Sequence, residues 1–546
     1  MELSLLLSWV QLFFLVVIGL YFLSLLRTQQ GSRIAIDRES RHEMEKLRKM
    51  RAVALSPPLT ELTRPSTFAE VVGQEDGLRA LRAALCGPHP QHVIVYGPPG
   101  VGKTAAARLV LEEAKRNPES PFGPDARFVE VDATASRFDE RGIADPLIGS
   151  VHDPIYQGAG PLGIAGIPQP KPGAVTRAHG GILFLDEIGE LHPVQLNRLL
   201  KVLEDRRVHF ESAYYSPEDP NIPRHIKDIF ENGLPADFRL VGATTRLPEE
   251  ISPAIRSRCM EIFFRPLEPE ELRRIAANAA VRVGFTVDGD ALELVGKYAA
   301  NGREAVNMVQ MAVGVAQVEG RRRITRADMD WVVTTGQYSP RVEVRPGTTP
   351  RVGVAYGLAV AGPNVGVVME VEASCHHVGG RRGQVRVTGA VEAEEVGAPG
   401  RRLRRKGQAL GAVETVLSAL AEILDRDLLD YDVHVNWPGG IPVDGPSGGV
   451  AVGAAVASAL LEVPVRPDVA LTGEVSVRGD VKAVGGIVPK IAAARRAGFS
   501  LAVVPRANCH LGLGGDGLEV HAVETLAEVL SLALVGSPAR EAVLSR

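Results

Sequence analysis

The chain has 546 residues, more than one compact domain usually holds. Hydrophobic residues make up 45% and charged residues 23%, which is ordinary for a protein with buried cores and excludes a disordered or collagen-like chain. The formal net charge of −4 gives no support for a nucleic-acid-binding surface, and the 4 cysteines are too widely spaced for a disulfide framework.

An apolar run covers residues 3–26 and is broken by only a few polar residues. About 20 helical residues cross a bilayer core, so the run is long enough to span it. A cleaved signal peptide or a buried helix are the alternatives, but the run is long, has no basic residue before it and is followed directly by Arg27. Lys and Arg are frequent only after the run, which predicts a cytoplasmic location for the rest of the chain. We therefore expect a single-pass transmembrane anchor at 1–27 and a juxtamembrane stalk at 28–58.

A glycine-rich loop lies between the apolar strand His92–Tyr96 and a helix expected at Ala105–Lys115. This order of strand, loop and helix is the context that a P-loop requires. Lys103 is expected to reach the β- and γ-phosphates of a nucleotide, and the Thr104 hydroxyl to bind Mg²⁺. The loop consists of Gly97, Pro98, Pro99, Gly100, Val101, Gly102, Lys103 and Thr104.

Two carboxylates end a second apolar strand at residues 180–185. Parallel strands present such end residues to the phosphate site. Asp186 is expected to hold Mg²⁺, and Glu187 to orient and activate the water that attacks ATP.

Strands expected at Phe128–Val131 and Phe238–Val241 complete a pattern that resembles the AAA+ ATPases. The resemblance implies an α/β parallel-sheet domain over 59–266. It also implies a polar sensor residue after the second of these strands, at Thr245 or Thr244.

Two arginines in Pro253–Arg258 resemble the segment that carries the arginine finger of this family. The resemblance favours Arg258 over Arg256, and a finger acts in trans on the neighbouring subunit of a ring. It further implies a helical lid at 267–336, in which Arg303 matches the second sensor.

A long stretch rich in glycine and proline lies between the two nucleotide motifs, from Ala133 to His179. Long loops inside a compact domain are usually functional. Residues 152–159 resemble the pore loop that grips unfolded polypeptide in ring unfoldases, with Tyr156 as the gripping aromatic residue and Ile155 beside it.

Residues 337–350 are expected to form a linker to a second catalytic domain at 351–546. A turn rich in glycine and proline presents Ser447 before a helix of small apolar residues, where N–H groups are available to an oxyanion. Lys490 lies among apolar and glycine neighbours, directly before a helix expected at Ile491–Ala497. Such neighbours lower the pKa of an amine and let it act as a general base.

These motifs occur in the order found in Lon proteases, which the chain resembles over about residues 60–535. The resemblance implies an α+β Lon-type protease domain with Ser447 as nucleophile, Lys490 as base and Thr472 as the residue that helps orient the lysine. The membrane span, in place of a large N-terminal domain, resembles the B-type branch of spore-forming bacteria and implies a role in sporulation. Gly448 departs from the alanine of many relatives, which puts the strength of the peptidase in doubt.

The resulting hypothesis is an ATP-dependent serine endopeptidase that uses ATP and Mg²⁺, forms a homo-oligomeric ring (a hexamer by resemblance) and degrades unfolded protein near the membrane without nucleic acid. One alternative is a DNA-associated motor with an inactive Lon-like domain and a basic patch at 401–406, although such a run is more often a solvated loop. The other is an ATP-driven chaperone with feeble peptidase activity.

Overall fold

The structure is a computed structural model with two compact units, Met1–Leu62 and Thr63–Arg546. It describes residues 15–19, 43–53, 56–135, 145–152, 167–212, 215–219, 222–341, 344–362, 364–389, 393–396, 403–406, 408–439, 445–509, 513–515 and 517–536.

In the N-terminal unit, residues 15–19 and 43–52 are helical, and α2 (Leu59–Leu62) ends the unit. The expected anchor at 1–27 lies outside the described residues except for 15–19. Within the ranges that the structure describes, no helix is long and apolar enough to cross a membrane.

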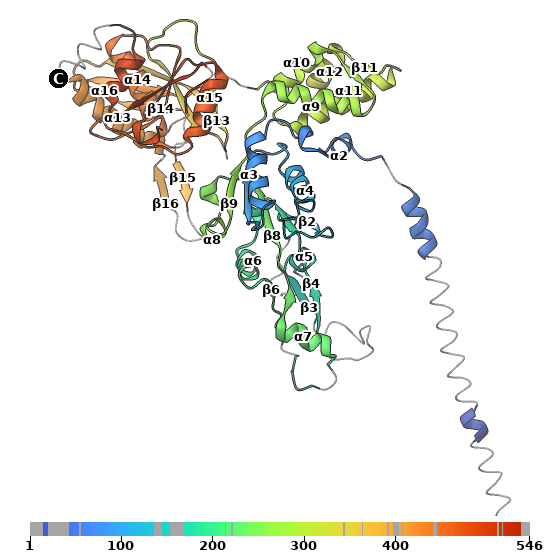
Figure 1. Ribbon diagram of the computed structural model, residues 1–546. Coiled ribbons are helices and arrows are strands. Elements are labelled where there is room, and N and C mark those ends of the chain that lie inside the picture. Colours follow the sequence, from blue (N-terminus) through green and yellow to red (C-terminus); the bar gives the residue numbers. More distant parts are fainter. Residues whose placement is uncertain are drawn as a thin grey trace, which may run out of the picture. The chain divides into compact units, whose positions relative to one another are not determined.

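The second unit begins with an α/β domain built on a five-stranded sheet of order β2-β5-β8-β1-β9 (Figure 1). All neighbouring strands in it are parallel. The C-terminal strand ends therefore share one edge, and the P-loop and both carboxylates lie at that edge. The strands are β1 (Val93–Tyr96), β2 (Phe128–Asp132), β5 (Ile182–Asp186), β8 (Arg239–Thr244) and β9 (Met260–Phe263).

Helices cover this sheet because its strands are apolar on both faces, as the buried strand β1 and the buried residues 182–185 of β5 show. On one face Ile94, Leu183 and Leu185 pack against residues of α6 and α7. The helices of the domain are α3 (Glu75–Leu85), α4 (Lys103–Ala114), α5 (Ala174–Arg177), α6 (Pro193–Asp205), α7 (Arg224–Asn232) and α8 (Pro253–Arg256).

The stretch expected to be a long loop is partly a β-hairpin, in which β3 (Gly149–His152) pairs antiparallel with β4 (Gln169–Pro172). Ile155 and Tyr156 lie between these strands but outside the described residues. A second short pair, β6 (Arg207–Val208) and β7 (Leu234–Pro235), flanks α7.

Four helices lie within residues 267–336, where the lid is expected. They are α9 (Pro269–Arg282), α10 (Gly289–Tyr298), α11 (Gly302–Val318) and α12 (Arg326–Thr335), with the short strands β10 (Thr286–Val287) and β11 (Arg323–Ile324).

The last domain is built on a mixed seven-stranded sheet of order β14-β17-β13-β12-β18-β21-β22. Antiparallel pairing joins β12 to β13 and β13 to β17, and the remaining neighbours are parallel. The strands are β12 (Val354–Val360), β13 (Gly366–His377), β14 (Val385–Thr388), β17 (Tyr431–Asn436), β18 (Val469–Leu471), β21 (Leu501–Pro505) and β22 (Glu519–Val523). A separate pair is β19 (Glu474–Val475) with β20 (Val481–Lys482).

Helices cover both faces of this sheet. Ala355, Met369 and Val371 contribute to a core with residues of three helices, α13 (Gln408–Leu424), α14 (Gly449–Leu461) and α16 (Leu526–Ala533). The opposite face is covered by α15 (Ile487–Ala497), against which Leu358 and Tyr356 pack. Alternate side chains of β12 thus enter different cores, as the strand period requires.

The basic run at 401–406 is not simply a solvated loop. Its described part is β16 (Leu403–Lys406), which pairs antiparallel with β15 (Ala393–Val396). Arg404 is paired with Glu395 and Arg405 with Glu394, so the basic strand lies beside an acidic one.

Candidate active sites

The P-loop has the backbone that only glycine adopts readily. The φ angles of Gly97, Gly100 and Gly102 are 153°, 71° and 93°. A Cβ on Gly100 would lie 2.7 Å from Oδ1 of Asn301, the residue that caps the first turn of α11. The lid therefore touches the loop directly, and glycine is needed there for close approach as well as for φ.

Lys103 is buried, and its ammonium donates to the carbonyls of Gly97 at 2.6 Å and Pro98 at 3.0 Å. Burial lowers the pKa of Lys103, while Glu187 and Asp186 oppose that effect. Arg303 of the lid also lowers this pKa, so the field of its guanidinium reaches the P-loop lysine. A buried ammonium in this setting would be stabilised by an anion such as a phosphate.

Glu187 follows β5 with φ 50°, an uncommon angle for a residue with a side chain. Its Oε2 accepts hydrogen bonds from the backbone N–H of Thr245 at 3.0 Å and from the Thr245 hydroxyl at 3.1 Å. Thr244 is instead the fully buried last residue of β8, and its hydroxyl accepts from the N–H of Arg246 at 3.1 Å. Of the two candidate sensors, Thr245 is the one in contact with Glu187.

The residues present fit a Mg²⁺ ion with a nucleotide. Asp186 ends β5, and burial raises its pKa while Lys103 opposes the shift. Thr104 supplies a hydroxyl in the first turn of α4. A carboxylate and a hydroxyl beside a phosphate cradle form the oxygen set that Mg²⁺ uses at nucleotide sites.

Arg258 lies at the opposite edge of the sheet from the P-loop of its own chain. Met260 is paired with Val93 at the start of β1, and the P-loop follows the other end of that strand, roughly 13 Å away at 3.3 Å per residue. Arg258 donates to the carbonyl of Ala254 at 2.8 Å and forms an ion pair with Glu204. This position suits a residue offered to a neighbouring copy.

Arg256 has a different environment. Its Nε donates to Glu261 Oε1 at 2.6 Å, and the buried Tyr96 hydroxyl donates to the same oxygen at 3.0 Å. The two donors lower the pKa of Glu261. Arg256 therefore holds the finger segment against β9 and β1 within its own subunit.

In the protease domain, Ser447 lies in the short helix η6 (Pro446–Gly448), directly before α14. The carbonyl of Ser447 accepts a hydrogen bond from the N–H of Gly473 at 2.9 Å and from the Thr472 hydroxyl at 3.4 Å. Thr472, which is fully buried, thus holds the backbone of the serine turn. That contact differs from the lysine contact implied by the family.

Lys490 lies inside the first turn of α15, whereas the sequence predicted a helix beginning only after it. It is 2% exposed, and burial lowers its pKa to about 8. The helix begins at this point because Gly486, with φ 65°, caps it. Part of the Lys490 side chains are therefore in the neutral amine form near neutral pH.

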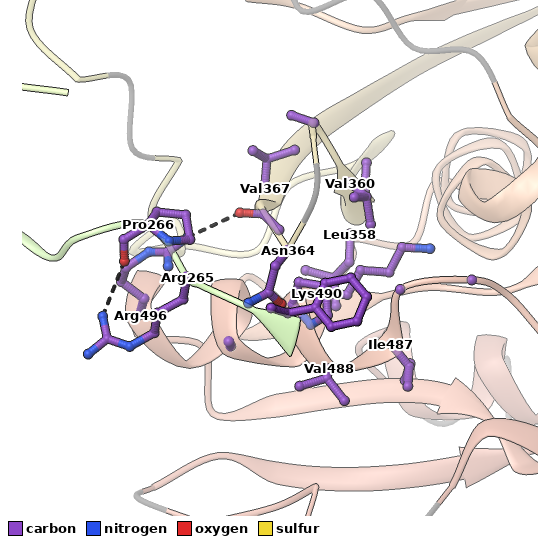
Figure 2. A pocket seen from close by; sticks show the side chains of 18 of the residues that line it. Arg265, Pro266, Leu358, Val360, Asn364, Val367, Ile487, Val488, Lys490 and Arg496 are labelled. Atoms are coloured by element: carbon purple, nitrogen blue, oxygen red, sulfur yellow. Dashed lines mark hydrogen bonds between the residues drawn. The ribbon is translucent and has the colours of Figure 1, made fainter. Parts of the chain in front are cut away.

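Ser447 and Lys490 both line one large pocket, to which residues outside the protease domain also contribute. Leu358 and Val360 of β12 line the same pocket beside Lys490, as Figure 2 shows. The apolar surroundings explain why the amine loses solvation. A serine and a buried lysine that lie far apart in the chain therefore line the same pocket.

Sequence reasoning missed Gly366, the first residue of β13. A Cβ there would lie 1.8 Å from the carbonyl oxygen of Pro489 and 2.9 Å from the N atom of Lys490. The strand therefore packs directly against the helical turn that carries the lysine. A glycine at the start of an apolar strand was the available signal, since such glycines often mark close backbone approach.

Comparison with known proteins identifies both domains. The family described as Lon protease (S16) C-terminal proteolytic domain matches residues 335–536. Magnesium chelatase, subunit ChlI, matches residues 67–220, which contain the P-loop and Asp186.

Whole-chain relatives agree with these matches. Lon protease 2 of Bacillus subtilis (strain 168) is 56% identical over 534 residues, which cover 98% of this chain and 96% of the relative. The archaeal Lon protease of Thermococcus kodakarensis is 29% identical over 464 residues, or 76% of this chain and 68% of the relative. The Lon protease of Geobacter metallireducens is 30% identical over 456 residues, or 79% of this chain and 49% of the relative.

A P-loop ATPase joined to a Ser–Lys pocket defines the class of protein, an ATP-dependent serine protease. With 56% identity to a curated relative over nearly its whole length, the chain belongs to the Lon protease family.

Proposed function

We propose that Ser447 and Lys490 are the catalytic pair of this protease. The neutral Lys490 amine accepts the proton of the Ser447 hydroxyl as its Oγ attacks the substrate carbonyl. The first N–H groups of α14 stabilise the oxyanion, and the resulting Lys490 ammonium protonates the departing amine. A water molecule then releases the acyl group with Lys490 again as base.

The observation that supports this proposal is the burial of Lys490. An ammonium that loses water without gaining an anionic partner is unfavourable, so its pKa falls to about 8. A lysine with only a structural role would reach solvent with its charged end. Lys490 instead is 2% exposed and lines the pocket that Ser447 also lines.

We further propose that the ATPase domain hydrolyses ATP to move unfolded protein toward this pocket. Lys103 binds the phosphates, and Glu187 orients the attacking water while Thr245 holds its carboxylate. Mg²⁺, when held by Thr104 and Asp186, supplies charge stabilisation for phosphoryl transfer. Because peptide hydrolysis is itself downhill, ATP serves unfolding and translocation.

We also propose that the chain assembles into a ring. The distance between Arg258 and its own P-loop supports a ring in which the finger acts on the next copy, and we propose a homohexamer with Tyr156 and Ile155 at the pore.

We propose that the N-terminus anchors the protein in a membrane. The apolar run at 3–26 and the basic residues after it support an anchor that keeps the catalytic domains in the cytoplasm of a sporulating cell. Co-flotation of the full chain with phospholipid vesicles, lost when residues 1–27 are removed, tests the anchor.

The catalytic pair is tested with a short fluorogenic peptide and a peptide boronate, a reagent that captures an active serine. The full chain in mild detergent should cleave the peptide and bind the boronate, and Ser447→Ala and Lys490→Gln should do neither while keeping the ATPase. Cleavage that persists in Ser447→Ala would refute the pair. ATPase activity without cleavage in the unaltered chain would favour the chaperone, and stimulation of that ATPase by DNA would favour the motor.

A further inference from the structure

A second pocket lies at the edge of the ATPase sheet where the strands begin. Its lining brings together the start of β1, the end of α6, the start of β8 and the segment before β9. Its charged side chains are Arg206, Asp237, Arg239 and Arg258. This is the edge that carries the proposed finger, Arg258.

The pocket is strongly cationic. Three arginines face one aspartate, and burial with the fields of Arg239 and Arg206 lowers the pKa of His92 to about 4, so this histidine is neutral at pH 7. Arg239 is occupied within the subunit, because it donates to the carbonyl of Pro90 at 2.6 Å and to Asp237 at 2.9 Å. Arg258 is also paired, with Glu204, whereas the contact of Arg206 with Asp237 is long at 3.6 Å. Arg206 is therefore the arginine of this pocket with the weakest partner among the described residues.

Arg206 has a backbone that a side chain rarely adopts. It ends α6 with φ 54° and ψ 25°, where the left-handed conformation usually selects glycine. An arginine is less favourable in this conformation than glycine. Its side chain is 64% exposed, and its guanidinium lies 3.6 Å from Asp237, beyond hydrogen-bonding distance. An exposed cation thus lines the same pocket as Arg258 of the finger segment.

The nucleotide face of a second copy has the complementary charge. Asp132 and Asp186 are neighbouring last residues of β2 and β5, and Glu187 follows β5, so three carboxylates gather at that edge of the sheet even before phosphates are added. A ring that brings Arg258 to a neighbour's nucleotide must bring this acidic edge against the cationic pocket.

We propose that Arg206 is a second arginine offered in trans, which contacts the anionic nucleotide face of the adjacent copy of this chain and positions it for hydrolysis. The inference rests on the proposed ring. It adds to each ATPase site a residue that comes from the neighbouring subunit.

The test uses the full chain in mild detergent. Arg206→Gly and Arg206→Asn both suit a positive φ, so they should fold and melt at or above the temperature of the unaltered protein. Removal of the charge should lower the kcat for ATP about fivefold, as expected for the loss of about 1 kcal/mol of transition-state stabilisation. Arg206→Lys keeps the charge and should recover most of that rate.

Mixed rings distinguish action in trans from an effect within the subunit. Glu187→Gln subunits should not hydrolyse ATP but still present Arg206 to a neighbour. Two equal mixtures are compared, one of Glu187→Gln with Arg206→Gly subunits and one of Glu187→Gln with unaltered subunits. If Arg206 acts in trans, the hydrolysis rates of these two mixtures should differ by less than the fivefold seen between the unmixed proteins. The inference is overturned if the two mixtures still differ fivefold in hydrolysis rate. It is also overturned if Arg206→Gly alone hydrolyses ATP as fast as the unaltered chain. If the unaltered chain does not hydrolyse ATP, or if Arg258→Ala keeps full activity, the proposed ring fails instead.

Discussion

Thr245 holds a single carboxylate oxygen of Glu187 with two hydrogen bonds, from its backbone N–H at 3.0 Å and from its hydroxyl at 3.1 Å. The contact is possible because β5 and β8 are neighbours in the sheet and end at the same edge. It ties the proposed water-activating group to the strand that carries the proposed sensor. The orientation of Glu187 therefore depends on a residue 58 positions away in the chain.

Thr245→Val should impair ATP hydrolysis more than ATP binding. The variant removes the hydroxyl but keeps the shape and the backbone N–H, so one of the two bonds that orient Glu187 is lost. We expect kcat to fall about tenfold with little change in KM, since loss of one such bond costs roughly 1–1.5 kcal/mol. Steady-state ATPase kinetics measure this, and Thr245→Ser is the matched control that restores the hydroxyl. A raised KM with unchanged kcat would contradict the assignment.

Peptide hydrolysis should rise with pH through about 8. Burial lowers the pKa of Lys490 to about 8, and only the unprotonated amine can take the proton of Ser447. Activity is therefore low when the amine is protonated and reaches a plateau above that pKa. Rates of cleavage of a short neutral peptide between pH 6 and 9.5, without ATP, measure the profile. A rate independent of pH over this range would argue against Lys490 as the base.

Gly366→Ala should reduce peptide cleavage at least tenfold while the ATPase is kept. The added Cβ meets the Pro489 carbonyl at 1.8 Å, so the turn that carries Lys490 must move. Gly411→Ala is the control in the same domain, because nothing lies within 4 Å of a Cβ there. Parallel peptidase and ATPase assays make the comparison. Equal peptidase rates for the two variants would show that the contact with Gly366 does not position the lysine.

The P-loop and the two carboxylates of the nucleotide site could be predicted because each depends on residues that are adjacent in the sequence. A strand, a glycine loop and a helix are adjacent in sequence, and Asp186 with Glu187 directly follows an apolar run. The choice between Thr244 and Thr245 could not be made from the sequence. It depends on which of two successive side chains reaches Glu187 when β8 lies beside β5.

In the protease domain the sequence identified the serine turn and the lysine but not what surrounds them. Gly366 meets Lys490 only because β13 lies under α15, a contact between segments 124 positions apart in the numbering. The earlier start of α15 depends on the left-handed cap at Gly486, which the sequence suggests only as a generic turn. The pairing of β15 with β16 was likewise invisible in a run of basic residues.

Gly448→Ala should stabilise the protein without blocking the pocket. Gly448 has φ −84° and ψ −1°, which any residue adopts, and a Cβ there meets nothing within 4 Å. The loss of chain freedom in the unfolded state should add about 0.4–1 kcal/mol to the free energy of unfolding. Urea denaturation measures the change, and peptidase activity should stay equal or increase. A lower unfolding free energy would show that the glycine is needed at this position.

In the proposed mechanism, ATP hydrolysis drives unfolded protein into a Ser447–Lys490 peptidase. Its most direct test is the degradation of unfolded casein by the full chain in mild detergent with Mg²⁺, with and without ATP, beside Ser447→Ala and Glu187→Gln. Fast degradation is expected only with ATP, and it should be lost in both variants while Ser447→Ala keeps its ATPase activity. Degradation that proceeds equally without ATP, or that survives Glu187→Gln, would contradict the coupling of the two sites.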